Sequence, residues 1–282
     1  MKHGWISRRY LGLELAGAKN QKTTLAVLEH YPKEQKLFLL DIYDRISGDG
    51  EMTGDAALLE TIRESIQDFP PQSVQLAVNV PIDLPPCIEC TRKTCPLPEK
   101  CTVPSVKWMR SLIKKGKKES PITPYTQRPM EIWIRHKVLP NLPEDCRFEI
   151  DEALGGSKAP RTARMFFLSR HLKNLVQIHE VWPKLSIALM AMDLGLSKKT
   201  LRAYRQLEEG VHARAEILDT LVKSYGIFIY ERDMRKLSES LPAFDAFVCA
   251  FTCMMKDLGA CADPPSGMPA HTGWVLYPDW KP

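Results

Sequence analysis

The sequence predicts an α/β protein in which a mixed β-sheet is flanked by helices and interrupted by a cysteine-rich insertion. Three observations predict this fold class. Three apolar segments of strand length follow one another near the N-terminus, a helical pattern and a fourth apolar strand come next, and four cysteines then fall within fifteen residues.

The composition is that of an ordinary folded protein. The chain has 282 residues, of which 44% are hydrophobic and 26% charged, and its formal net charge is +5. These values exclude a disordered chain, a collagen and a coiled-coil rod. No apolar run reaches the roughly 18 residues of a membrane helix. Glu14 interrupts the stretch Leu11–Ala16, which makes a poor secretory signal. We therefore expect a cytoplasmic protein without membrane contact.

The first strands are predicted to form an antiparallel meander. In Tyr10–Ala16 every second residue is leucine, the alternation of a strand with one buried face, and Thr23–Leu28 and Leu37–Tyr43 are typical of two further strands. Asp55–Phe69 has apolar residues at helical spacing and stops before two prolines, and Ser73–Val80 is a fourth strand. Three strands, a helix and another strand are the element order of an RNase H-like sheet.

The rest of the chain divides at a change of composition. Residues 84–124 are rich in proline, cysteine and lysine, and we interpret them as an insertion into an RNase H-like domain formed by residues 1–83 and 125–282. The later predicted elements are helices over Arg128–Val138, Ser197–Tyr225 (with a break at Gly210) and Pro242–Leu258, and strands over Leu175–Trp182, Gly226–Tyr230 and Gly273–Tyr277.

Three acids lie inside apolar segments, where a carboxylate is costly unless it is paired, protonated or bound to a cation. Asp245 is the sole charged residue of Ala243–Met255, Glu180 lies in the apolar strand Val176–Trp182, and Glu14 lies mid-strand. Each acid has an ordinary alternative. Asp245 is near a helix N-terminus, Glu180 could pair with a buried arginine, and Glu14 could face solvent.

A functional interpretation brings these acids together. If the first and fourth strands are neighbours, Glu14 and Asn79 can approach each other on one face. With Glu180 and Asp245 they could hold two divalent cations about 3.5–4 Å apart, the arrangement that hydrolyses phosphodiesters. We expect Mg²⁺ or Mn²⁺ at such a site. An arginine paired with each acid would argue against it.

Several motifs also resemble a known family. Matching segments occur at Gly12–Gly17, Val78–Pro81, Gln177–Pro183, Asp245–Ala250 and Gly273–Val275, and at Arg128–Glu131 with Arg135. On these motifs the chain resembles a domain-of-unknown-function family of predicted nucleases with an RNase H-like fold.

The resemblance implies a metal-dependent nuclease and a set of functional residues. The implied catalytic residues are Glu14, Asn79, Glu180 and Asp245, with Arg128 and Arg135 contacting phosphate and Glu131 orienting one of these arginines. Two positions depart from the family pattern, which has aspartate where this chain has Glu14 and an acid where it has Asn79. The longer side chain and the lost charge should weaken metal binding, so we expect an impaired site.

Four cysteines suggest a second metal site. Cys87, Cys90, Cys95 and Cys101 lie close together in a chain without a clear export signal, which favours a metal over disulfides. Four thiolates suit tetrahedral Zn²⁺ or a [4Fe–4S] cluster, and the spacing leaves both open. The alternative is a set of free thiols or a labile disulfide. The other four cysteines, Cys146, Cys249, Cys253 and Cys261, are expected to pack in the core.

A basic run follows the cysteines. Residues 107–118 carry six basic residues and no acid. Lys114 and Lys115 with Trp108 could contact nucleic acid, although a solvated helix end with Trp108 as an anchor is the ordinary alternative. The chain is therefore interpreted as a nuclease or as a non-catalytic nucleic-acid-binding protein. A third hypothesis, an actin-like ATP-handling protein, rests on a faint phosphate-loop pattern at Gly17–Thr24.

Overall fold

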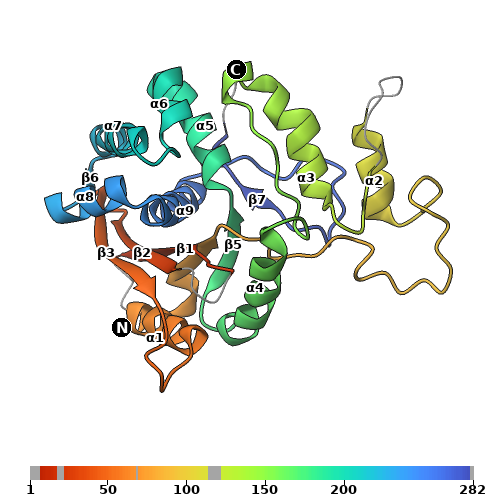
Figure 1. The fold of residues 1–282 in the computed structure, drawn as a ribbon, viewed down its shortest axis with the longest axis horizontal. Coiled ribbons are helices and arrows are strands. Elements are labelled where there is room, and N and C mark those ends of the chain that lie inside the picture. The colour runs from red at the N-terminus through yellow and green to blue at the C-terminus, as the bar shows by residue number, and fades with distance from the viewer. Residues whose placement is uncertain (1–6, 18–21, 68, 114–121, 280–282) are drawn as a thin grey trace.

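A mixed β-sheet is the centre of the molecule (Figure 1). The computed structural model describes residues 7–17, 22–67, 69–113 and 122–279. Within them seven strands form one sheet in the order β6-β3-β2-β1-β4-β5-β7. The strands are β1 (Arg8–Glu14), β2 (Thr23–Tyr31), β3 (Lys36–Ile46), β4 (Val74–Val78), β5 (Gln177–Val181), β6 (Ile227–Phe228) and β7 (Val275–Leu276).

The strand directions divide the sheet into two parts. The strands β1, β2 and β3 pair antiparallel, as the meander predicts. The strands β4, β5 and β7 then continue from β1 in parallel, and β6 pairs in parallel with β3. The carboxyl ends of β1, β4 and β5 therefore lie at one edge of the sheet, where side chains from distant segments can meet.

Helices cover both faces of the sheet (Figure 1). The longer helices are α1 (Gly54–Ile66), α4 (Lys158–Leu172), α5 (Pro183–Leu194), α7 (Glu209–Tyr225) and α9 (Leu241–Asp257), and the shorter ones are α2 (Pro104–Leu112), α3 (Pro129–Trp133), α6 (Lys198–Ala203) and α8 (Glu231–Glu239). Single turns of other helix types cover Pro71–Ser73, Ile134–Val138, Leu139–Asn141 and Glu144–Cys146. One apolar core joins α1 and α4 to the sheet, and another joins α5, α7, α8 and α9 to its opposite face. The predicted α/β class, a mixed sheet flanked by helices, is confirmed.

The helix α9 packs unusually close to β1. A Cβ atom added to Gly12 would lie 1.9 Å from the carbonyl oxygen of Ala246 and 2.6 Å from the amide nitrogen of Ala250. Glycine at this position therefore lets the helix backbone rest on the strand. This contact sets the height of α9 above the sheet, and so the position of Asp245 relative to Glu14.

Replacing Gly12 with alanine should lower the free energy of unfolding by about 1–3 kcal/mol, because the methyl group overlaps backbone atoms that cannot rotate away. Urea unfolding measures the change. Gly54→Ala is the matched control, since a Cβ there would lie no closer than 3.6 Å to its neighbours. Equal stability of the two variants would contradict the close packing of α9.

The predicted insertion lacks regular structure over most of its length. Its described part contains α2, and no helix or strand lies in residues 84–103. The Trp108 ring stacks on Trp133 of α3 with centroids 6.0 Å apart, so Trp108 anchors α2. Arg110 donates to the carbonyl oxygens of Pro98 and Cys101, which uses this cation within the insertion.

Among the described helices, none is by itself long and apolar enough to cross a membrane. The pair α8 and α9 reaches the required length and composition together, but it bends by 112° at its break.

Candidate functional site

Glu14 and Asn79 meet at the carboxyl edge of the sheet. The strands β1 and β4 are parallel neighbours, as the sequence hypothesis requires. Glu14 ends β1 and Asn79 directly follows β4, and the Asn79 Nδ2 donates to Glu14 Oε2 at 2.6 Å. The amide of Asn79 also donates to the carbonyl oxygen of Leu13 at 3.1 Å, which fixes its backbone.

Asp245 approaches the same place from α9. Its side chain is buried, and Arg205 Nη1 donates to both of its carboxylate oxygens at 3.0 Å. Burial and repulsion by Asp245 raise the pKa of Glu14 to about 7, against the opposing effects of Asn79 and Arg161. Burial likewise raises the pKa of Asp245, although Arg205 acts in the other direction. The two carboxylates are therefore close enough to disfavour each other's charge.

Glu180 does not join them. The register pairs Leu13 with Val78 and Val78 with Glu180, so these three side chains share one face of the sheet. Leu13 and Val78 belong to the core beneath α1 and α4. Glu14 and Asn79 come one residue later and point to the opposite face, because strand side chains alternate. The expectation that all three acids meet in one cleft is wrong.

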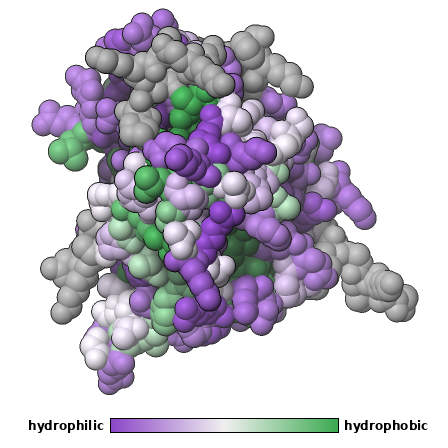
Figure 2. Space-filling model, turned by 90° about the vertical axis from the view of Figure 1, so that its right-hand side faces the viewer, coloured by the Kyte–Doolittle hydropathy of each residue, from purple (hydrophilic) through white to green (hydrophobic). Residues whose placement is uncertain are grey.

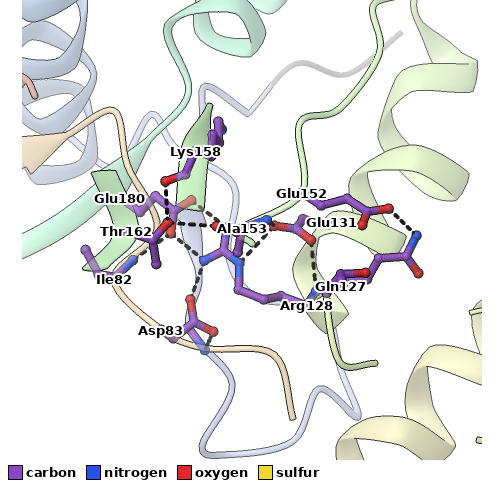
Figure 3. A network of polar contacts seen from close by, with 12 residues as sticks. Ile82, Asp83, Gln127, Arg128, Glu131, Glu152, Ala153, Lys158, Thr162 and Glu180 are labelled. Carbon is purple, nitrogen blue, oxygen red and sulfur yellow. Dashed lines mark hydrogen bonds and ion pairs between the residues drawn. The ribbon is translucent and has the colours of Figure 1, made fainter. Parts of the chain in front are cut away.

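Glu180 is instead one of three acids around a buried arginine (Figure 3). Arg128 Nη1 and Nη2 donate to the two Glu180 oxygens at 2.6 and 2.7 Å, and the Arg128 side chain is only 1% exposed. The same guanidinium also donates to Asp83 and to Glu131. Burial acts to raise the pKa of Glu180, but Arg128 outweighs it and the pKa is lowered.

The expected contact of Arg128 with phosphate is therefore wrong, whereas Glu131 does orient Arg128, as expected. Glu131 is fully buried and accepts hydrogen bonds from the Arg128 and Ala153 amides, both at 2.9 Å. Its carboxylate caps the start of α3 and orients the Arg128 guanidinium toward Asp83 and Glu180. Neither side chain reaches solvent, so neither can meet a substrate.

Asp83, the third acid of this group, is not among the site residues that the sequence predicts. Asp83 Oδ2 accepts from the Gly273 amide at 3.1 Å, and a Cβ on Gly273 would lie 2.5 Å from the Asp83 Cγ. Asp83 lies between Ile82 and Leu84, and a charge in that apolar setting is the signal that could have revealed it. Asp83 directly precedes the predicted insertion and Arg128 comes shortly after it, so their ion pair joins the two ends of the insertion.

A small cleft of about 110 Å³ opens above Glu14 and Asn79. Its lining is rich in charge, with the basic side chains of Lys158, Arg161, Lys184 and Arg205 and the acidic ones of Glu14, Glu149 and Asp151. Arg161 Nη1 donates to Glu14 Oε1 at 3.3 Å. The Lys158 ammonium lies 5.1 Å from the Trp182 ring centre, and the Lys184 ammonium 5.9 Å from that of Phe148.

Lys158 and Lys184 line this cleft without a direct ion pair, although the carboxylates of Glu180 and Asp245 lie near enough to attract them. Within the part of the chain that the structure describes, neither ammonium group forms an ion pair or hydrogen bond. Burial lowers the pKa of Lys158, although the nearby Glu180 opposes this effect. An anion entering the cleft would compensate the Lys158 ammonium for the water that it loses on burial.

The acids of the cleft do not fit a pair of divalent cations. Among the described residues, no three His, Cys, Asp or Glu side chains are arranged to hold a metal ion. Glu14 and Asp245 each have an arginine partner, and Glu180 lies on the other face of the sheet. We therefore derive no reaction step through Mg²⁺ or Mn²⁺.

The remaining predicted contacts lie elsewhere. Arg135 is half exposed, 3.9 Å from Glu152, and it does not line the cleft. Lys114 and Lys115 lie outside the described residues.

The segment suspected of binding ATP shows no free hydroxyl groups in its described part. Thr23 Oγ1 accepts hydrogen bonds from the Ala16 amide and from Arg164, and Thr24 Oγ1 donates to Asp44.

The cysteines form two groups. All eight are free thiols; Cys249 and Cys253 are buried in α9, as core packing predicts, and Cys146 and Cys261 are half-buried. In the predicted insertion Cys101 is buried, Cys87 half-buried, and Cys90 and Cys95 exposed.

No family model matches the chain, and no curated protein or solved structure matches it either.

Proposed function

We propose that this chain is a nucleic-acid-binding protein with an RNase H-like fold, and that its cleft holds a phosphate of the nucleic-acid backbone. The observation that carries the proposal is that the ammonium groups of Lys158 and Lys184 line the cleft and, within the described residues, form no direct ion pair or hydrogen bond. The sheet order, with β2 reversed between the parallel strands β3 and β1, supports the choice of fold.

The size of the cleft and the two lysines without an ion pair favour a phosphate group over a larger ligand, although Glu149 and Asp151 also line it. Its volume of about 110 Å³ is below the roughly 300–1,000 Å³ of pockets that enclose whole small ligands. A phosphodiester needs little depth and gains from several cations at once, as the backbone contacts of nucleic-acid-binding proteins do. Burial withdraws the Lys158 ammonium from water, which strengthens its attraction for an anion.

Phosphodiester hydrolysis is the second candidate function. It is favoured by the meeting of Glu14, Asn79 and Asp245 and by the Glu14 pKa of about 7, which suits a general base at neutral pH. It is disfavoured by the arginine partner of each acid. Binding without cleavage is therefore the function that the geometry supports best.

Charge reversal at the cleft should weaken binding strongly. We expect Lys158→Glu and Lys184→Glu each to weaken binding of a fluorescently labelled single-stranded RNA or DNA at least tenfold in anisotropy titrations, because each removes a phosphate contact and adds repulsion. Lys33→Glu is the control, since it makes the same charge change on the exposed turn between β2 and β3, beyond the opposite edge of the sheet. Equal losses in all three variants would indicate non-specific attraction to the whole protein.

The same oligonucleotides separate the two candidate functions. Incubation with Mg²⁺ or Mn²⁺ should leave them intact while they bind. Cleavage that Glu14→Gln and Asp245→Asn both abolish would replace the binding proposal with the hydrolytic one.

A further inference from the structure

The cysteine-bearing segment, residues 84–103, has little to hold it in place. It contains no helix or strand, and Ile88 and Leu97 are 51% and 65% exposed. Leu97 also has a left-handed backbone, with φ of 66°. Figure 2 shows the side of the molecule that carries this segment, where hydrophobic groups form small separate patches among hydrophilic ones. A segment of this length without regular structure is uncommon in a compact protein.

Hydrogen bonds fix the backbone at Cys87 and Cys101, and between them the segment has a few contacts, among them the Arg92 side chain donating to Thr102 at 2.6 Å. The Cys87 amide donates to the Pro124 carbonyl at 3.0 Å, and Arg110 Nη1 donates to the Cys101 carbonyl at 2.8 Å. These contacts attach Cys87 to the chain before α3 and Cys101 to α2. Cys90 and Cys95 lie between them with exposed thiols.

The four thiols belong to one short segment. Cys87, Cys90, Cys95 and Cys101 lie within fifteen residues, and none of them forms a disulfide. Four free thiols at this spacing are the ligand set of a soft metal.

We propose that Cys87, Cys90, Cys95 and Cys101 bind a thiophilic metal through four thiolates, either as one Zn²⁺ or as an iron–sulfur cluster. Each thiol loses its proton to solvent on binding. In the described residues the four thiols do not yet form a coordination shell. Binding therefore draws the exposed Cys90 and Cys95 toward the fixed Cys87 and Cys101, which a segment without helix or strand permits.

The metal would also shape a neighbouring cavity. Cys90 lines a cavity of about 340 Å³ together with Asp83 and His271. Closing the segment around a metal fixes this wall next to Asp83, which is held by Arg128. Through Asp83 and Arg128 the metal site would be linked to the core of the molecule. The metal proposal does not depend on nucleic-acid binding at the cleft above Glu14 and Asn79.

Elemental analysis of the full chain, purified without oxygen or chelator, tests the proposal. We expect one zinc per chain in a colourless protein, or about four irons and four inorganic sulfides with broad visible absorption. Substoichiometric metal in protein whose four thiols are reduced would overturn the proposal.

Single cysteine variants locate the site. Cys90→Ser and Cys95→Ser should each lose the bound metal, although both thiols are exposed and contribute no core packing. Cys146→Ser, a half-buried thiol outside the segment, should keep it. Full metal content in both segment variants would contradict four-thiolate binding. If a variant does not fold, alkylation of the wild-type chain decides, because the segment thiols should react only after a chelator is added.

Discussion

Replacing Arg128 with methionine should lower the free energy of unfolding by about 3–5 kcal/mol, the usual cost of removing one partner from a buried charge cluster. The substitution leaves three carboxylates around an apolar side chain, and all three depend on this guanidinium. Burial already raises the pKa values of Asp83 and Glu131, so these groups tolerate no further loss of positive charge. Urea unfolding with soluble protein, or the yield of folded protein, measures the effect.

Arg135→Met is the matched control, because Arg135 lies on the following turn, is 35% exposed and is 3.9 Å from its acid. It should change stability by less than about 0.5 kcal/mol. Glu180→Gln should partly rescue Arg128→Met, since it removes one of the stranded charges. A stable Arg128→Met protein would mean that the acids do not depend on Arg128.

Replacing Glu14 with glutamine should stabilise the protein at pH 8. Folding raises the Glu14 pKa from 4.5 to about 7, so the folded state holds this proton more tightly than the unfolded state. Stability therefore falls as pH rises between these two values, and the loss is complete above them. Glutamine keeps an oxygen for the Asn79 hydrogen bond and carries no charge. We expect a gain of about 1–3 kcal/mol at pH 8.

The gain should shrink as the pH falls toward 4.5, where both folded and unfolded Glu14 take up the proton. Thermal unfolding at pH 5 and pH 8 provides the comparison. Glu60→Gln, at an exposed site on α1, is the control and should change stability little at either pH. A Glu14→Gln variant that is less stable at pH 8 would show that the Arg161 ion pair outweighs burial and the repulsion from Asp245.

Two acids of the cleft, Glu14 and Asp245, could be predicted from the sequence, because strand alternation and helix spacing are local patterns. Glu14 in a leucine-rich strand and Asp245 in an apolar helix are visible without any knowledge of contacts. The position of Glu180 depends on register, which pairs it with Val78 and not with Asn79. A shift of one residue moves a side chain to the other face, and nothing in the local pattern of β5 sets the register.

The helices that the sequence pattern missed have physical reasons of their own. The helix α5 is buried along nearly its whole length, so it has no polar face to give a 3.6-residue period. In α4 the buried residues Met165 and Leu168 are separated by two phenylalanines, which hides the pattern. The Arg128 group combines acids from three separate segments, and only the folded chain brings them together.

The salt dependence of binding tests the central claim most directly. For single-stranded RNA, each phosphate contact contributes about 0.7 to the slope of log affinity against log salt. The double variant Lys158→Gln/Lys184→Gln should therefore bind more weakly and show a slope smaller by about 1.4 than the wild type. An unchanged slope together with unchanged affinity would mean that the cleft above Glu14 and Asn79 does not hold the phosphate backbone.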